Sequence, residues 1–201
     1  MVNHEQRREE LARAVWAVVV RSGVEAASVR TVAAEAGWSM GALRHYFSAQ
    51  DELLRFALYA MTRRISLRVR HHLEHELRVQ ELLEELLPLD EERHGEALIW
   101  LAFMAKSRTD PQVDELRTTA WHGGRFISRV AVAHYAKVPL PQGNSIPLND
   151  DALEREAEDL HTFIDGLTLQ GANYPDQMPP VLQRELLRRQ LDALRARVGE
   201  A

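Results

Sequence analysis

The sequence predicts an all-α protein in which a small three-helix head precedes a larger helical body. Apolar residues recur at spacings of three and four along most of the chain, the period of a helix with one buried face. No segment is predicted as a β-strand. With 201 residues, 45% of them apolar, the chain can bury one substantial core and carry a small appended unit. We expect the head in residues 1–50 and the body in residues 51–201.

The first predicted helix covers residues 5–22. Its apolar stripe has helical spacing and consists of Leu11, Val15, Val18 and Val19. We expect this stripe to pack across the next two helices and complete the core of the head. Gly23 then ends the helix.

Two short helices joined by a tight turn are predicted over residues 28–47. Ser28 can cap the first of them, and its buried face comprises Val29, Val32, Ala33 and Ala36. Gly37 ends this helix because glycine readily adopts the left-handed conformation, and Ser39 can cap the second helix. Two helices separated by about three residues form a helix-turn-helix.

The second helix of this motif is predicted to face DNA. Its inward residues, at spacing i, i+3, i+4, are Leu43, Tyr46 and Phe47. The residues left on or near its outward face are Met40, Gly41, Arg44 and His45. Because the second helix of a helix-turn-helix enters the major groove, these residues can meet a base or a phosphate.

The motif also resembles a family signature. The matching positions are Ser28, Val32-Ala33, Ala36-Gly37, Ser39, Gly41, Leu43, His45-Tyr46-Phe47 and Leu53. On these residues, about positions 8–55 resemble the DNA-binding region of the tetracycline-repressor (TetR) family of bacterial transcription regulators. Two positions depart from that pattern: Arg44 stands where many members have a tyrosine, and Gln50 where a phosphate-contacting lysine is common. The first change can strengthen base or phosphate reading, and the second removes one expected backbone contact.

The motif and the resemblance together predict a surface for double-stranded DNA. Its residues are Ser28, Arg30, Thr31, Ser39, Met40, Gly41, Arg44, His45, Tyr46 and Gln50. The charge distribution agrees with this placement. Residues 1–70 carry an excess of four positive charges, and residues 71–201 an excess of nine negative charges. A basic head on an acidic body is expected when only the head meets phosphates.

The body is predicted to consist of long helices. Their approximate ranges are residues 51–76, 79–87, 90–107, 111–137, 151–172 and 180–198. The single long loop, residues 138–149, contains Pro139, Pro141, Gly143 and Pro147, which exclude a helix there.

Aromatic and methionine side chains concentrate in the body. Each one alone is more often a core residue, but together with nearby histidines they can line an apolar cavity with a few polar groups, as ligand sites do. We predict an effector cavity bordered by Met61, Trp100, Phe103, Met104, Trp121, His122, Phe126 and Phe163.

Two leucine-rich stripes near the C-terminus predict a homodimer. The stripes are longer than one core should need, and their contact residues are predicted to be Leu160, Ile164, Leu167, Leu187, Leu191 and Leu194. Residues 164–171 (IDGLTLQG), followed by Pro175, resemble the C-terminal region of the choline-responsive, BetI-like branch of the TetR family.

The sequence shows no catalytic or cofactor-binding pattern. It has no glycine-rich phosphate loop, no GxSxG elbow and no cysteine, so no catalytic residue, cofactor or disulfide is predicted. His71, His72 and His75 can share a helix face, but no glutamate is placed as in zinc proteases, and no metal site is predicted. No segment reaches the about 18 apolar residues of a membrane helix, so we expect a cytoplasmic protein.

The favoured interpretation is a homodimeric, ligand-responsive DNA-binding regulator. As in the family it resembles, it would be a repressor of a palindromic operator, released by a small hydrophobic molecule. One alternative is an all-helical carrier or enzyme with a vestigial head, and another is a protein-protein adaptor. Binding to short duplexes during a salt titration separates these hypotheses, because only phosphate contacts produce a steep loss of affinity with salt.

Overall fold

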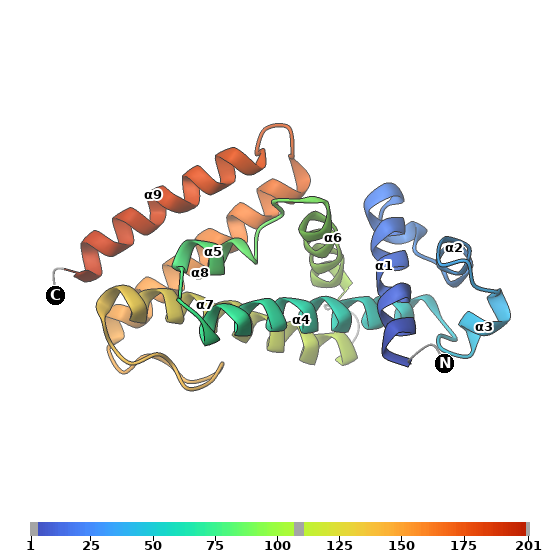
Figure 1. Cartoon of the computed structure of the whole chain (residues 1–201), viewed down its shortest axis with the longest axis horizontal. Coiled ribbons are helices and arrows are strands. Elements are labelled where there is room, and N and C mark those ends of the chain that lie inside the picture. Colours follow the sequence, from blue (N-terminus) through green and yellow to red (C-terminus); the bar gives the residue numbers. More distant parts are fainter. Residues whose placement is uncertain (1–3, 107–110, 200–201) are drawn as a thin grey trace.

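A computed structural model describes residues 4–106 and 111–199, apart from the side chains at positions 4, 5, 24, 103, 105, 106 and 111–113. Within those ranges the chain forms helices and connecting turns without strands, which confirms the predicted fold class (Figure 1). The elements are α1 (His4–Ser22), η1 (Val24–Ala26, a 3-10 turn), α2 (Val29–Glu35), α3 (Met40–Arg44), α4 (Gln50–Glu74), α5 (Val79–Glu84), α6 (Glu91–Lys106), α7 (Pro111–Ala136), α8 (Asp151–Asn173) and α9 (Pro180–Gly199).

The helices divide between the two ends of an elongated molecule. In Figure 1, α2 and α3 form one tip, α1 stands next to them, and α7, α8 and α9 occupy the other end. α4 runs along the long axis from the head into the body. The sequence did not predict η1, and it predicted a longer α3, which here ends at Arg44.

The head has its own apolar core. α1, α2, α3 and the first half of α4 contribute to it, with fully buried residues such as Leu11, Val32 and Leu43. Leu53 and Leu58 of α4 belong to the same cluster. The link from head to body is therefore a continuous, partly buried helix, and the division at residue 50 stays a prediction.

The head rests against α6. Ile99 of α6 belongs to the head core. α1 and α6 approach each other closely at Gly95 of α6. A Cβ added to this glycine would lie 2.9 Å from Cγ2 of Val20 in α1. Side-chain contacts at this distance do not occur in relaxed structures, so α1 and α6 sit directly on one another.

The body core explains the two leucine stripes. It combines α5, α7, α8 and α9 with the second half of α4. The six residues predicted to contact a second subunit all lie inside it and are at most 4% exposed: Leu160, Ile164, Leu167, Leu187, Leu191 and Leu194. This corrects the prediction for these side chains. α9 folds back over α7 and α8, so both stripes are covered within one chain.

Among the described residues, no helix combines the length and the apolar character needed to cross a membrane. The long helices instead carry charged residues on their outer faces.

Candidate nucleic-acid interface and effector region

Ser28 caps α2, as predicted. Its hydroxyl accepts a hydrogen bond from the Thr31 backbone N–H at 3.2 Å, and the Thr31 hydroxyl accepts one from the Ser28 N–H at 2.9 Å. This reciprocal arrangement satisfies backbone donors that the first helical turn leaves open. Both half-buried side chains thus fix the start of α2, so that their hydroxyls are already engaged within the head.

The turn between α2 and α3 is also formed as the sequence indicates. Gly37 has φ +69°, a left-handed conformation that side chains rarely adopt, and it reverses the chain after α2. The hydroxyl of Ser39 then accepts a hydrogen bond from the N–H of Ala42 at 3.1 Å and caps α3. These contacts set the angle between the two helices.

Two of the three residues predicted to hold α3 are buried. Leu43 is completely buried, and the ring of Phe47 packs 5.1 Å from that of Phe56 in α4. Tyr46 differs from the prediction, since it is 37% exposed. α3 ends at Arg44, so Tyr46 follows the helix and turns its ring edge-on to Trp38, with the centroids 5.8 Å apart.

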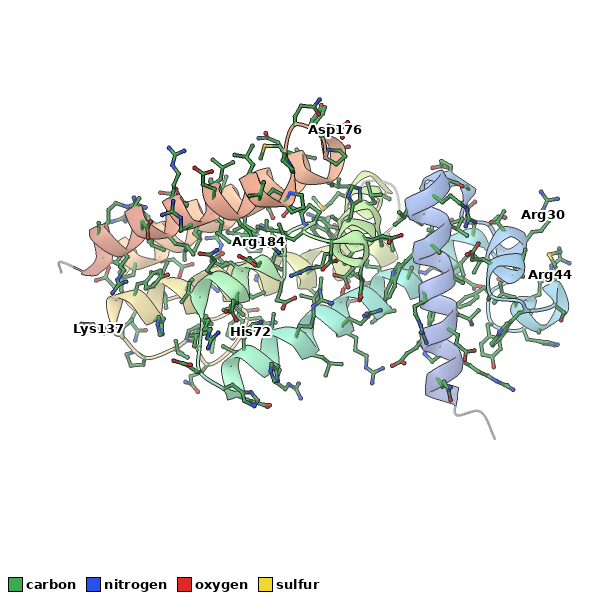
Figure 2. The ribbon with its side chains drawn as sticks, turned by 45° about the horizontal axis from the view of Figure 1, so that its top comes forward. Arg30, Arg44, His72, Lys137, Asp176 and Arg184 are labelled. Carbon is green, nitrogen blue, oxygen red and sulfur yellow. The ribbon has the colours of Figure 1, made fainter. Side chains whose placement is uncertain are left out.

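Most of the predicted DNA-binding residues lie on the outward surface of the head. The exposed ones are Arg30, Ser39, Met40, Gly41, Arg44, His45 and Tyr46. Figure 2 shows Arg30 and Arg44 at the tip of the head, pointing away from the body. Gln50 is half-buried, and its side-chain amide donates to the Glu25 carbonyl at 3.4 Å. It therefore ties the start of α4 to the segment before α2.

A hollow beside α3 adds a residue that the predicted set lacks. It has a volume of about 630 Å³ and is lined by Arg7, Trp38, His45 and Tyr46, among others. The guanidinium of Arg7, from α1, lies 5.9 Å from the centroid of the Trp38 ring. The spacing of α1 places Arg7 off the buried stripe, but only the tertiary structure brings it next to α3.

The predicted effector residues do not share one lining. Met61 belongs to the head core and Trp100 packs against it, whereas Phe126 and Phe163 pack against the body core. Met104 and Trp121 are exposed, and His122 is half-buried with an Nδ1 atom that has no hydrogen-bond partner among the described residues. The side chain of Phe103 lies outside the described part. The apolar cavity thus stays a prediction.

A buried polar cluster links α7 to α8. The side chain of Arg129 donates to both carboxylate oxygens of Glu154: Nε lies 2.9 Å from Oε1 and 2.9 Å from Oε2, and Nη2 lies 2.6 Å from Oε1. Its Nη1 donates to the Asn144 carbonyl at 3.0 Å, which anchors the long loop. Burial raises the pKa of Glu154, but the hydrogen bonds from Arg129 and from the Leu148 N–H outweigh it, and the net pKa is lowered.

Arg125 extends this cluster to an aromatic surface. Its Nε donates to Nδ1 of His161 at 3.3 Å, and its guanidinium lies 5.0 Å from the centroid of the Trp121 ring. His161 is buried against Gly124, where an added Cβ would lie 2.6 Å from Nε2. Burial, with the positive charges of Arg125 and Arg129, lowers the pKa of His161 from 6.5 to about 4. The imidazole is therefore neutral at pH 7.

Comparison with known proteins identifies the family. Residues 11–56 match the model of bacterial regulatory proteins of the tetR family, and residues 75–196 match the C-terminal region of the BetI-type transcriptional repressors. The second match alone covers more than half of the chain. The chain belongs to the TetR family. It is a helix-turn-helix transcriptional regulator, and both resemblances seen in the sequence are confirmed.

Individual transcriptional regulators are similar to this chain in sequence or in fold. The regulator PksA of Bacillus subtilis is 37% identical over 172 residues, covering 84% of this chain and 80% of PksA. A transcriptional regulator from Rhodococcus sp. Rha1 superposes with a TM-score of 0.71 at 28% identity, over 96% of this chain and 97% of its own. A regulator from Saccharomonospora viridis, solved with choline, has a TM-score of 0.71 over 94% of this chain and 97% of its own, and at 20% identity shows the fold alone.

The sequence reasoning missed the polar cluster of this TetR-family body. Arg125 and Arg129 are one helical turn apart, and Glu154, Glu158 and His161 repeat at the same period on the next helix. That spacing could have identified two facing polar stripes. The sequence alone does not indicate that these stripes are buried, because arginine and glutamate on helices most often face solvent.

The three histidines near the end of α4 have local partners. The Nδ1 atom of His75 lies 2.8 Å from the His71 carbonyl oxygen, and Nε2 of His72 lies 3.1 Å from Oε1 of Glu85. Within the described ranges, no group of three or more histidines, cysteines or carboxylates is arranged to hold a metal ion.

Proposed function

We propose that this TetR-family regulator binds a palindromic operator as a homodimer. Arg44 and Arg30, exposed on the tip of a basic head, carry this proposal. Each α3 would enter a major groove, with the two half-sites about 34 Å apart. Arg44 would contact a guanine or a phosphate, and the rest of the predicted surface would position the head on the backbone.

We propose that the dimer uses the outer faces of α8 and α9, since their leucine stripes are covered within the chain. Large apolar side chains remain exposed at the end where these helices meet, namely Leu169, Tyr174 and Val181. An α8–α9 pair from each subunit would form a four-helix contact and set the distance between the two heads.

The effector is proposed to be a small hydrophobic molecule bound in the body. Choline is the ligand of the S. viridis protein, but a quaternary ammonium group is disfavoured at Trp121, because Arg125 already lies over that ring. An uncharged apolar molecule meets no such repulsion. It would release the operator if it binds more tightly to the head spacing that DNA rejects.

Regulation, rather than catalysis or transport with a vestigial head, is the function that the exposed head supports. The relatives are regulators rather than enzymes, and we place this protein in the cytoplasm, where it would reach DNA.

A salt titration of binding to duplexes tests this function. Palindromes in the DNA flanking the gene supply the duplexes, and fluorescence anisotropy measures affinity from about 50 to 200 mM salt. Specific binding with a steep salt dependence is expected. Affinity that is absent, or insensitive to salt, would favour the carrier, enzyme or adaptor alternatives.

A further inference from the structure

A second cleft lies between the head and the body. It has a volume of about 760 Å³ and is lined by α1, by α4, and by residues that precede and open α6. This volume falls within the roughly 300–1,000 Å³ of small-molecule sites. The cleft includes none of the predicted DNA-binding or effector residues.

The cleft carries excess positive charge. Six arginines and four acidic residues line it, which leaves two positive charges in excess. Most of the acidic residues are already paired with arginines of the same cleft: Glu85 with Arg68, Asp90 with Arg93, and Glu92 with Arg64. Among the described residues, by contrast, Arg8 and Arg13 of α1 form no ion pair with a carboxylate. Two cations therefore remain available on the wall that the head contributes, where the carboxylate of Glu9 also lies.

Aromatic rings lie against two of the six arginines that line the cleft. The guanidinium of Arg64 lies 4.5 Å from the centroid of the Trp16 ring, and that of Arg8 lies 5.0 Å from the centroid of the Phe56 ring. Such contacts orient a guanidinium without neutralising it. The opposite wall, on α4, presents Tyr59 and Leu67, which are 59% and 53% exposed. The cleft thus combines fixed cations with an open apolar surface.

Arg64 is paired with Glu92 and is also partly withdrawn from solvent. Burial is the largest influence and lowers its pKa, while the charge of Glu96 acts in the opposite direction and does not restore the ordinary value.

We propose that this cleft binds a small organic anion with a flat apolar part. Its carboxylate or phosphate group would lie between Arg8 and Arg13, and its flat part would lie against Tyr59 and Leu67. Arginine suits this role because its planar donors match both kinds of anion. Since one wall belongs to the head and the other to α4, the bound anion would hold α1 against α4.

Calorimetric titration of the full chain with defined probes tests the site. 1-Naphthyl phosphate and 1-naphthoate combine an anion with a flat ring, and they differ in the anionic group. Inorganic phosphate and 1-naphthol carry only one feature each. We expect saturable binding of at least one combined probe at one site per chain, and binding weaker by about tenfold or more for the two partial probes.

Matched variants locate the binding. Arg13→Gln removes one cation of the cleft, and Arg70→Gln removes an exposed arginine of α4 outside it. Leu67→Ala and Ile146→Ala remove aliphatic side chains of similar exposure, 53% and 52%, of which only the first lines the cleft. Each cleft variant should weaken the combined probe by about tenfold, and neither control should change its affinity.

Hydrogen exchange tests the bridging role. Bound probe should slow amide exchange in α1 and in the facing part of α4, but not in α9. The site is refuted if no combined probe saturates, if the partial probes bind as well, or if the control variants weaken binding equally. Saturable binding without slower exchange in α1 would refute the bridge between head and body.

Discussion

The head and the body use their charged residues in opposite ways. In the body, the buried Arg129 pairs with the largely buried Glu154 and also donates a hydrogen bond to a loop carbonyl. In the head, within the described part of the chain, neither Arg30 nor Arg44 belongs to an ion pair, and both are exposed. The paired charges of the body thus complete the fold, whereas these two arginines of the head remain available to another molecule. Similar residues should therefore have different mutational effects at the two ends.

The largest effect is expected from Arg129→Ala. The substitution leaves the carboxylate of Glu154 largely buried without its bidentate partner, so the free energy of unfolding should fall by about 3–5 kcal/mol. Urea denaturation measures this change. Arg155→Ala, at an exposed position of α8, is the control and should change stability by less than about 0.5 kcal/mol. Equal stability of the two variants would contradict a structural role for the body charges.

Acid should weaken the body through His161. Its pKa is about 4 in the folded protein and 6.5 when unperturbed, so the unfolded chain binds more protons between these values. Stability should therefore decline as the pH falls from about 6.5 towards 4, by up to about 3 kcal/mol from this residue. Urea denaturation at a series of pH values, with His161→Gln for comparison, tests the effect. A variant with the same pH dependence as the wild type would assign the acid sensitivity to other groups.

Arg44→Ala should affect DNA binding without affecting the fold. Loss of one guanidinium contact should weaken operator binding by about tenfold or more, and the exposed position predicts unchanged urea denaturation. If Arg44 reads guanine, preference at one position of the half-site should relax. If it contacts only phosphate, binding should weaken uniformly and the salt slope should fall by about one unit. Wild-type affinity would place Arg44 away from DNA.

The smallest effect is expected at the start of α2. Ser28→Ala removes the side-chain half of the capping box and should lower the free energy of unfolding by about 1 kcal/mol. Ser28→Asp can still accept the Thr31 N–H and should retain most of that stability. Circular dichroism during denaturation measures both variants. A loss as large as that of Arg129→Ala would mean that the head depends on this polar contact more than on its apolar core.

The elements were predictable from local rules, whereas their partners depended on tertiary structure. The caps at Ser28 and Ser39 and the reversal at Gly37 follow from local sequence, and the structure reproduces them. The leucine stripes of α8 and α9 show which faces are buried, but the same period describes a core within one chain and a contact between two. Only the return of α9 over α7 and α8 decides between these possibilities.

The candidate sites also differ in how far the sequence alone predicts them. The exposed face of α3 follows from helical spacing, since Leu43 fixes which side is inward. Composition alone predicts the effector residues and carries no distance information, and the structure distributes them over two cores. The cleft between the head and the body is lined by residues far apart in the chain, so no single stretch of sequence indicates it.

The close approach at Gly95 has a consequence for the evolution of operator recognition. Any larger residue at this position would force Val20 to shift, and α1 would move away from α6 where that side chain has no room to turn. In the proposed dimer each head would then sit at a new angle, and the distance between the two α3 helices would change at both ends of the operator. One methyl group far from DNA could thus alter the half-site spacing that the regulator accepts, while the residues that read the bases stay the same.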